Sequence, residues 1–443
     1  MIRYTYISLL TLFALLFSSY ANAALRIEIT GGTEGALPIA VVPFGWQGSG
    51  APPEAVSEII ADDLTRSGRF AALDESQLVA RPHFGNEVKF KTWRFLKVEN
   101  LVIGNVRRTG PQQFEVRFQL FDIFKGEQLA GYTIPSTATG LRRTAHQISD
   151  IIYEALTGEK GAFTTRIAYV TADGANKNRT YFLNVSDADG FNEQTILRSR
   201  EPLLSPSWAP DGRQLAYVSF EAGTSQIYMQ DVFRGSRKLI ASFKGLNSAP
   251  AWAPDGSRLA MTLSKDGNAE IYLFDVATRN LKRMTFNRAI DTEAAWAPDG
   301  KSLIFTSDRG GKPHIYRLFV NAAGQRGQLK RLTFEGRYNT RASFSPDGKL
   351  ITFVHSVNGD YRIATQDLKT GNVQVLTETS LDESPSFAPN GSMIIYATNE
   401  NNKGVLAAVS VDGRVHQRLL IKNKDVREPA WSPFEKRNAK GAN

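Results

Sequence analysis

The sequence predicts a mainly β protein, in which a six-bladed β-propeller closed by the C-terminal strand is preceded by a small α/β domain. A seven-residue pattern recurs six times, and the aromatic residue at its third position returns every 43 to 48 residues. Stretches of alternating apolar and polar residues follow every copy except the last, which predicts three further strands in each unit. Four antiparallel strands in about 44 residues make one propeller blade.

The first 23 residues have the pattern of a signal peptide. Arg3 precedes a mostly apolar run over 7–17, and residues 21–23 (Ala-Asn-Ala) supply the small-x-small pattern that precedes a cleavage site. The apolar run is shorter than the roughly 20 residues that span a bilayer. We therefore expect cleavage between Ala23 and Ala24 and export of a mature chain that is not embedded in a membrane.

The composition excludes several classes of function. The chain of 443 residues contains no cysteine, which rules out disulfides, thiolate catalysis, Cys-ligated zinc and a lipidated cysteine anchor. The formal net charge is +9, but the lysines and arginines are scattered, and the one basic cluster lies in the tail at 435–443. Without a basic stripe, an exported chain is not expected to bind nucleic acid.

A short alternating segment, residues 24–35, precedes the α/β domain. Its alternation of apolar and polar residues indicates a β-strand, and Gly31 and Gly32 follow as a hinge. Two interpretations stay open: the first edge strand of the α/β domain, or a tethered strand that adds to the sheet of a partner by β-augmentation. The residues at the centre of this strand are Leu25, Arg26, Ile27, Glu28 and Ile29.

Residues 36–160 carry no repeat and predict a small α/β domain. Strands are expected at 39–44, 101–104 and 114–124, and amphipathic helices at 53–69 and 141–156. Gly158 follows the second helix as its C-terminal stop. Mixed strands with two helices pack as a layered α/β domain.

Residues 163–434 carry the repeat. Its copies are PSWAPDG (206–212), PAWAPDG (250–256), AAWAPDG (294–300), ASFSPDG (342–348), PSFAPNG (385–391) and PAWSPFE (429–435). Pro-Asp-Gly is turn chemistry, because proline presets φ, aspartate caps the turn and glycine accepts positive φ. The last copy has no strand after it, whereas three strands near 166–197 have no copy before them. The C-terminal strand should therefore complete the first blade and close the ring.

The motif residues themselves predict architecture rather than chemistry. The six aromatic residues recur once per blade, so we expect them in the core between blades rather than stacked on a sugar. The five histidines are widely separated, no G-x-S-x-G elbow is present and the glycine-rich stretches lack a phosphate-binding lysine. We therefore expect no catalytic residues, no metal and no cofactor.

The loops that enter the six innermost strands converge on one mouth of the propeller channel. Each carries a polar or acidic residue just before the motif. Such residues are either ordinary exposed turns or a concave, charged ring that docks a protein partner. The candidate docking residues are Glu201, Asn247, Asp291, Thr292, Glu293, Tyr338, Asn339, Asp382, Glu383, Asp425 and Glu428.

The order of parts resembles the TolB family, the periplasmic component of the Tol-Pal system of Gram-negative bacteria. The resemblance rests on the signal peptide, on PIAVVPF at 38–44 and on the repeat closed by a C-terminal strand, and it spans essentially the whole mature chain. The repeat alone is only moderately specific, because propellers attached to prolyl peptidases carry similar ones. The tail at 435–443 is a departure to which the resemblance assigns no role.

The resemblance implies a non-enzymatic periplasmic scaffold. In the family the propeller mouth binds Pal, the peptidoglycan-associated lipoprotein, and the mature N-terminus binds the inner-membrane protein TolA, with the two sites coupled. The system keeps the outer membrane intact and draws it inward at cell division. On this chain the Pal face would be the docking residues above, foremost 291–293, and the TolA segment would be residues 24 to 34. A monomer is expected, with other outer-membrane or periplasmic proteins as further candidate partners.

Two other classes of function stay open at this point. The propeller module of a peptidase would need a hydrolase domain of roughly 200 further residues, for which the chain has no room. A propeller that binds a small ligand, a sugar or a quinone, would need aromatic residues in the mouth loops, where Tyr338 is the one candidate.

Overall fold

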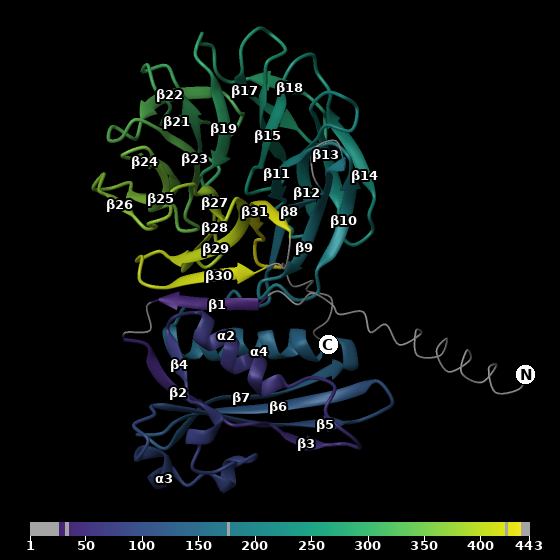
Figure 1. The fold of residues 1–443 in the computed structure, drawn as a ribbon, viewed down its shortest axis with the longest axis vertical. Coiled ribbons are helices and arrows are strands. Elements are labelled where there is room, and N and C mark those ends of the chain that lie inside the picture. Colours follow the sequence, from purple (N-terminus) through teal and green to yellow (C-terminus); the bar gives the residue numbers. More distant parts are fainter. Residues whose placement is uncertain (1–25, 32–34, 175–177, 421–423, 436–443) are drawn as a thin grey trace, which may run out of the picture.

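The computed structural model describes residues 26–31, 35–174, 178–420 and 424–435. The expected signal peptide with Ala23, as well as Ala24, Leu25 and the tail beyond Glu435, lies outside the described residues. Figure 1 shows two units, a propeller and a smaller α/β domain whose helices α2 and α4 lie nearest to it. None of the helices in the described part of the chain has the length and apolar character needed to cross a bilayer.

The α/β domain is a mixed sheet in the order β4-β2-β5-β6-β7, with β3 paired to β5. Strand β2 runs parallel to β4 and β5, whereas β5, β6 and β7 are antiparallel. The strands are β2 (Leu37–Val41), β3 (Gly45–Gln47), β4 (Phe70–Ala72), β5 (Asn100–Arg108), β6 (Gln113–Asp122) and β7 (Glu127–Thr137). The helices are α2 (Val56–Arg66), α3 (Phe90–Arg94) and α4 (Leu141–Thr157), and single 3-10 turns lie at Glu75–Gln77, Gly85–Glu87 and Ala138–Gly140.

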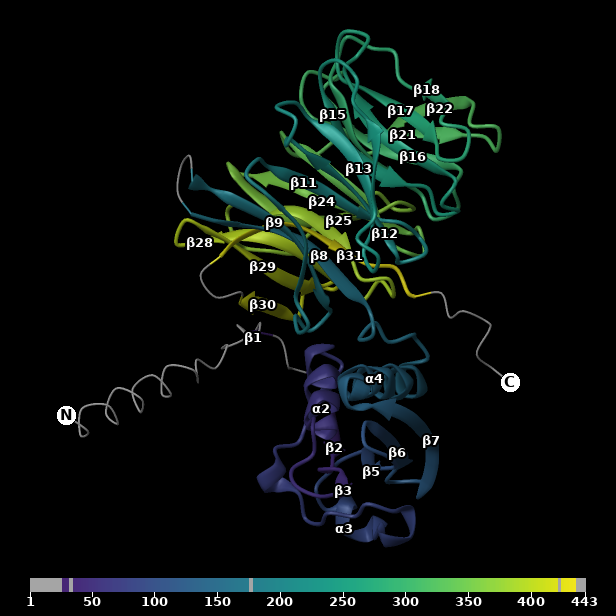
Figure 2. The same ribbon diagram turned by 90° about the vertical axis from the view of Figure 1, so that its right-hand side faces the viewer.

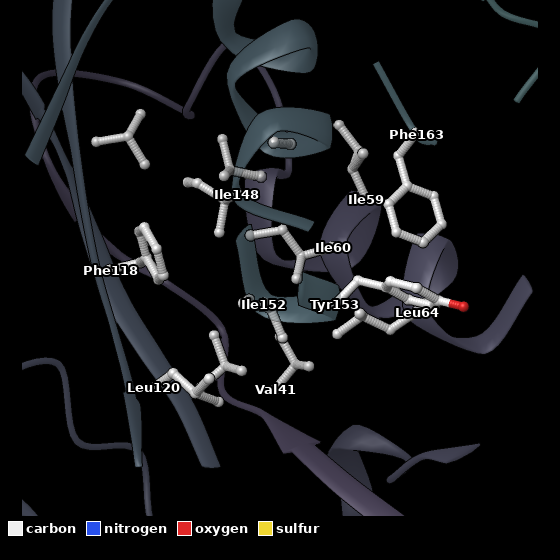
Figure 3. Packing of buried hydrophobic residues seen from close by; sticks show 14 of the residues in the cluster. Val41, Ile59, Ile60, Leu64, Phe118, Leu120, Ile148, Ile152, Tyr153 and Phe163 are labelled. Atoms are coloured by element: carbon white, nitrogen blue, oxygen red, sulfur yellow. The ribbon is translucent and has the colours of Figure 1, made fainter. Parts of the chain in front are cut away.

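The core of this domain lies between the sheet and the two long helices. Figure 3 shows Ile60 of α2 and Ile152 of α4 on the side of Phe118 of the sheet, whereas Ile59 lies beside Phe163. Burying each such side chain contributes about 1.5–3 kcal/mol. Helix α2 starts at Val56, later than the expected 53. Helix α4 ends at Thr157 and is followed by Gly158, whose φ of 75° suits a glycine. The short strands β3 and β4 and the long edge strand β7 were not predicted.

The propeller has six blades, numbered from the one nearest the N-terminus, and each is an antiparallel sheet. Blade 1 is β31 (Asp425–Trp431), β8 (Arg166–Asp173), β9 (Thr180–Asp187) and β10 (Gln194–Ser199). Blade 2 is β11 (Leu203–Trp208), β12 (Gln214–Ser219), β13 (Gln226–Asp231) and β14 (Arg237–Ala241). Blade 3 is β15 (Asn247–Trp252), β16 (Arg258–Leu263), β17 (Glu270–Asp275) and β18 (Leu281–Arg283).

The other three blades follow the same order from the channel outward. Blade 4 is β19 (Asp291–Trp296), β20 (Ser302–Ser307), β21 (His314–Val320) and β22 (Arg326–Arg331). Blade 5 is β23 (Asn339–Phe344), β24 (Leu350–Val357), β25 (Asp360–Asp367) and β26 (Val373–Val375). Blade 6 is β27 (Glu383–Phe387), β28 (Met393–Glu400), β29 (Lys403–Ser410) and β30 (His416–Leu420).

The ring closes as the repeat predicts. The C-terminal strand β31 pairs antiparallel with β8, so the last strand of the chain is the innermost strand of blade 1. The Trp208 indole donates a hydrogen bond to the Ala430 carbonyl at 3.0 Å, which joins blade 2 to blade 1. The Pro-Asp-Gly turns are capped as expected; for example, Asp211 accepts from the Arg213 amide at 2.8 Å. The fold class is thus confirmed, including the closure by the C-terminal strand.

The N-terminal strand β1 (Arg26–Gly31) lies where neither interpretation of the sequence put it. It pairs antiparallel with β30, with Ile27 opposite Leu419 and Ile29 opposite Gln417. It is therefore a fifth strand on the outer edge of blade 6, and the expectation of an edge strand in the α/β domain is wrong. The physical reason is that β30 presents an outer edge of backbone donors and acceptors. Figure 1 shows β1 between β30 and the helices of the α/β domain.

Candidate functional site

The channel of the propeller is the first candidate site. A cavity of about 670 Å³ is lined by residues from the innermost strands of all six blades. These strands run beside the channel axis, so one position of the repeat recurs six times around the wall. Partner-binding loops and strand ends of a propeller meet at such a channel, which makes it a natural docking site.

Six bulges form a ring in the channel wall. Each innermost strand shifts register against its neighbour near the position three residues before the motif aromatic. At each bulge a residue other than glycine has a positive φ, between 44° and 57°. These six residues are Ser205, Ala249, Glu293, Arg341, Ser384 and Glu428. Because a left-handed backbone costs a non-glycine residue roughly 1–2 kcal/mol, a ring of six marks a candidate functional feature.

The charged members of this ring are joined across the channel. Arg341 Nε lies 3.2 Å from Glu293 Oε1, and its Nη1 lies 3.0 Å from Glu428 Oε1. Arg341 also donates to the Ser384 hydroxyl, and Glu428 accepts from the Ser205 amide at 3.2 Å. The carboxylates of Glu428 and Glu293 raise the pKa of Arg341. One guanidinium therefore ties four blades together and leaves the ring one net negative charge.

Several of the predicted docking residues are buried and hold the loops in place. The equivalent residues Asn247, Asp291, Asn339 and Asp382 begin or directly precede their strands and have almost no exposed surface. The Asn247 amide bonds the backbone of Phe243, and Asp291 pairs with Arg309 at 2.6 Å. Burial raises the pKa of Asp291 and of Asp382. The expectation that these four side chains face outward is wrong, because the entering loops need internal partners for their own backbone groups.

Of the seven other predicted docking residues, six lie nearer the surface and one is buried. Glu201 is exposed, whereas Glu428 is buried in the ring. The remaining five residues are half-buried; they are Thr292, Glu293, Tyr338, Glu383 and Asp425. The structure brings Glu293 and Glu428 together through Arg341, and it places Asp425 beside Arg179 at the rim. Binding of a partner by any of these residues stays a prediction.

Two features of the mouth were not predicted from the sequence. Arg341 was not predicted, although the position three residues before each aromatic varies (Ser, Ala, Glu, Arg, Ser, Glu) within an otherwise uniform motif. The entering loops also carry exposed aromatic residues in addition to Tyr338, foremost Phe286 and Phe334, which are 61% and 70% exposed. Tyr338 is therefore not the one aromatic residue of these loops. Phe286 and Phe334 lie beside Arg283 and Arg331 of the outermost strands, and exposed aromatic residues of this kind are typical of protein-binding surfaces.

The N-terminal strand is the second candidate site. Its backbone is paired with β30, with an irregularity in register between Ile29 and Gly31. Of the predicted partner-binding segment, Leu25 lies outside the described residues, and Arg26, Ile27, Glu28 and Ile29 belong to β1. A strand at the edge of a sheet can exchange one neighbour for another.

One group in the described residues has spacing that suits a metal ion. Ligand atoms of His146, Asp187 and Asp189 lie within 4.8 Å of one another where the α/β domain meets blade 1. This group lies apart from both candidate sites.

Comparisons with known proteins agree with this architecture. A family model described as the TolB beta propeller domain matches residues 153–435, and one described as the TolB amino-terminal domain matches residues 25–129. The Tol-Pal system protein TolB of Nitrosococcus oceani is 63% identical over 412 residues, which cover 93% of this chain and 94% of that protein. The protein of the same name from Thioalkalivibrio sulfidiphilus is 60% identical over 96% of this chain and 98% of its own length.

A solved structure is similar along nearly the whole chain. The crystal structure of TolB from Acinetobacter baumannii superposes with a TM-score of 0.85 at 45% sequence identity. The superposition covers 92% of this chain and all of that one.

Proposed function

The chain belongs to the TolB family of the Tol-Pal system, and from this premise we propose that it is a non-enzymatic periplasmic scaffold. In this proposal the mouth of the propeller binds the lipoprotein Pal, and the mature N-terminal segment binds TolA. The complex supports outer-membrane integrity and the inward movement of the outer membrane at division. The proposal gives the two candidate sites one partner each.

The ring of six bulges is the observation that carries the Pal contact. A left-handed backbone at Glu293, Arg341 and Glu428 turns their side chains together across the channel. Glu293 and Arg341 remain about a quarter and a third exposed, so a partner in the mouth can reach them. The exposed Phe286 and Phe334 add apolar area on the outer part of the entering loops, beside Arg283 and Arg331 of the outermost strands. A polar centre that can be desolvated, with aromatic residues nearby, is how protein interfaces obtain affinity.

A pull-down with the mature protein tests the Pal contact. We expect the wild-type protein to recover a Pal-like lipoprotein from periplasmic extract, and Glu293→Arg to recover at least tenfold less. Lys301→Glu is the matched control, because it reverses a charge in the turn at the other end of the same innermost strand. Equal recovery by all three proteins, or no lipoprotein with any of them, would contradict the proposed site.

The TolA contact is supported by the position of β1. Its pairing with β30 shows that the segment forms a regular strand against a sheet edge, which is the conformation that β-augmentation requires. The same backbone groups cannot pair with β30 and with a partner at once. Deletion of residues 24–34 should therefore abolish binding of purified TolA while leaving Pal recovery unchanged; retained TolA binding would exclude this segment.

A small-ligand function is the second candidate. The channel volume of about 670 Å³ falls within the range of about 300–1,000 Å³ that is usual for ligand pockets. Calorimetric titration with disaccharides and soluble quinones discriminates the two proposals. Micromolar binding that Arg341→Ala removes would favour the ligand function, whereas no heat from either class favours the scaffold.

A further inference from the structure

A buried cluster of charges joins the two domains. His146 of α4 lies between Asp63 of α2 and Asp189, which follows β9 in the propeller. Its Nδ1 is 2.7 Å from Asp63 Oδ2, and its Nε2 is 3.2 Å from Asp189 Oδ2. All three residues are at least 95% buried. Charges so deep in a protein are costly unless they are matched, so this cluster is a strong geometric constraint.

Two arginines complete the cluster. Arg142 donates to Asp189 and stacks 3.4 Å from the ring centre of Phe191, which lies in the same propeller loop. Arg66 pairs with Asp63 at 2.6 Å. Two carboxylates are thus faced by two guanidinium groups and one imidazole. The charged groups around the imidazole are Asp63 and Arg66 of α2, Arg142, Arg143 and Asp150 of α4, and Arg166, Asp187 and Asp189 of the propeller.

The imidazole in this setting is a cation. Burial by itself would lower the pKa of His146, but the carboxylates of Asp63 and Asp189 outweigh it and raise the pKa to about 9. Burial likewise opposes ionisation of Asp189, yet His146 and the arginines hold its pKa well below the usual range. An imidazolium has no lone pair for a metal, and Asp189 already accepts from Arg142. The cluster is therefore an ionic contact rather than a metal site.

Helix α2 connects this cluster to the N-terminal strand. Asp63 lies in the cluster, and one turn later the Arg66 carbonyl accepts a hydrogen bond from the Gln417 side chain of β30. Gln417 is also the residue that faces Ile29 of β1 in the strand pairing. The same helix thus contacts the cluster at one point and the strand that carries β1 at the next.

The interface between the domains is not close-packed throughout. A cavity of about 860 Å³ lies beside the cluster, lined by His146 and Asp187 together with Arg143 and Arg166. Figure 2 shows the α/β domain below the propeller, joined to it along α2 and α4. A change in the angle between the domains would accordingly break few apolar contacts at this place.

We propose that the cluster of His146, Asp63, Asp189 and Arg142 is a latch between the domains, whose opening lets α2 move away from β30 and frees β1. While the latch is closed, α2 holds β30 in the geometry to which β1 pairs. When it opens, the α/β domain turns on the propeller and the support of β30 is lost. The latch regulates the N-terminal segment and rests on the proposed function only for the use that the freed strand then finds.

Hydrogen–deuterium exchange of the mature protein tests the latch without any partner. His146→Gln removes the cation from the side of the α/β domain, and Asp189→Asn removes the anion from the side of the propeller. In both variants we expect the increase in exchange rate for the backbone amides of β1 and β30 to exceed the increase for those of β5 by at least tenfold, because the rates in β5 report only the stability of the α/β domain. His83→Gln is the matched control, because it replaces a histidine of the same domain away from the interface.

Three results would overturn the latch. One is exchange in β1 and β30 within twofold of the wild type in both variants. Another is equal acceleration throughout β5 in Asp189→Asn, which would make the cluster a support of the domain fold. The third is slower exchange on addition of Zn²⁺ or Mn²⁺ that His146→Gln abolishes, which would make the cluster a metal site. These exchange rates are measured without TolA, so failure of the TolA proposal would not change them.

Discussion

The propeller uses charge in opposite ways at the domain interface and at the channel mouth. At the interface Asp189 is buried and matched by Arg142 and His146 of the α/β domain. At the mouth Arg341 and Glu293 also pair, yet they remain about a third and a quarter exposed. Both clusters cross from one structural unit to another, but only the second is open to a partner.

This difference separates charges that hold the fold together from charges that are accessible to a partner. A buried pair fixes geometry, because removing one partner leaves the other charge without compensation in a poorly polarisable surrounding. An accessible pair in a concave channel contributes less to stability and can change partners. Variants of the two clusters should therefore differ in what they lose, stability in one case and affinity in the other.

Replacing the buried histidine should give the largest loss of stability. His146→Ala removes the cation between Asp63 and Asp189, each of which keeps one arginine, and should lower the free energy of unfolding by about 3 kcal/mol. Glu293→Gln at the mouth should cost less than about 1 kcal/mol. Urea unfolding followed by circular dichroism measures both, and equal costs would remove the distinction between the two clusters.

The same histidine should make stability depend on pH. Because its pKa is raised from 6.5 to about 9, its contribution is complete below pH 6.5 and is lost as the pH rises through 9. The shift corresponds to about 3 kcal/mol. His146→Gln should flatten the decrease between pH 6.5 and 9 in thermal unfolding, whereas His83→Gln should not; an unchanged slope in His146→Gln would show that another group titrates.

A buried residue at the mouth should stabilise the fold without contributing to the binding of Pal. The Asn339 side chain donates to the Glu335 carbonyl at 2.8 Å and bonds His355 at 2.7 Å. Asn339→Ala should therefore cost about 1–3 kcal/mol and leave the affinity for Pal within twofold of the wild type. A loss of affinity for Pal at unchanged stability would instead show that Asn339 belongs to the docking surface.

The smallest expected effect is a gain in stability. Ala249 holds a φ of 44° in the ring of bulges, and a glycine there avoids the strain at some cost in backbone entropy. Ala249→Gly should raise the free energy of unfolding by about 0.5–1 kcal/mol, measured by urea unfolding. A loss of stability instead would mean that the bulges are not strained.

The sequence predicts the repeating parts of the fold well because their causes are local. The turn after Trp296 needs Pro298, Asp299 and Gly300 whatever surrounds it, and the missing strands at the two ends of the repeat imply the closure by β31. The place of β1 has no local cause. Its pattern fits any exposed sheet edge, and only the assembled propeller shows that β30 offers one.

The candidate site could be predicted only in part. The mouth loops are found from the repeat, but Asn247 and Glu293 look equally polar in sequence although one is buried and the other lines the channel. Burial depends on the bulges, which arise when the strands pair. The latch is harder still to predict, because His146 and Asp189 are brought together by the packing of two separate domains.

A charge swap in the ring of bulges tests whether Pal is recognised at that ring. Glu293→Arg alone should lower both the stability and the affinity for Pal. Glu293→Arg combined with Arg341→Glu restores the ion pair between blades 4 and 5 but loses the pair between position 341 and Glu428. We predict that the double variant is more stable than Glu293→Arg alone but still binds Pal at least tenfold more weakly than the wild type in calorimetric titration. Recovery of affinity together with stability would show that the pair is architecture and that Pal is recognised elsewhere.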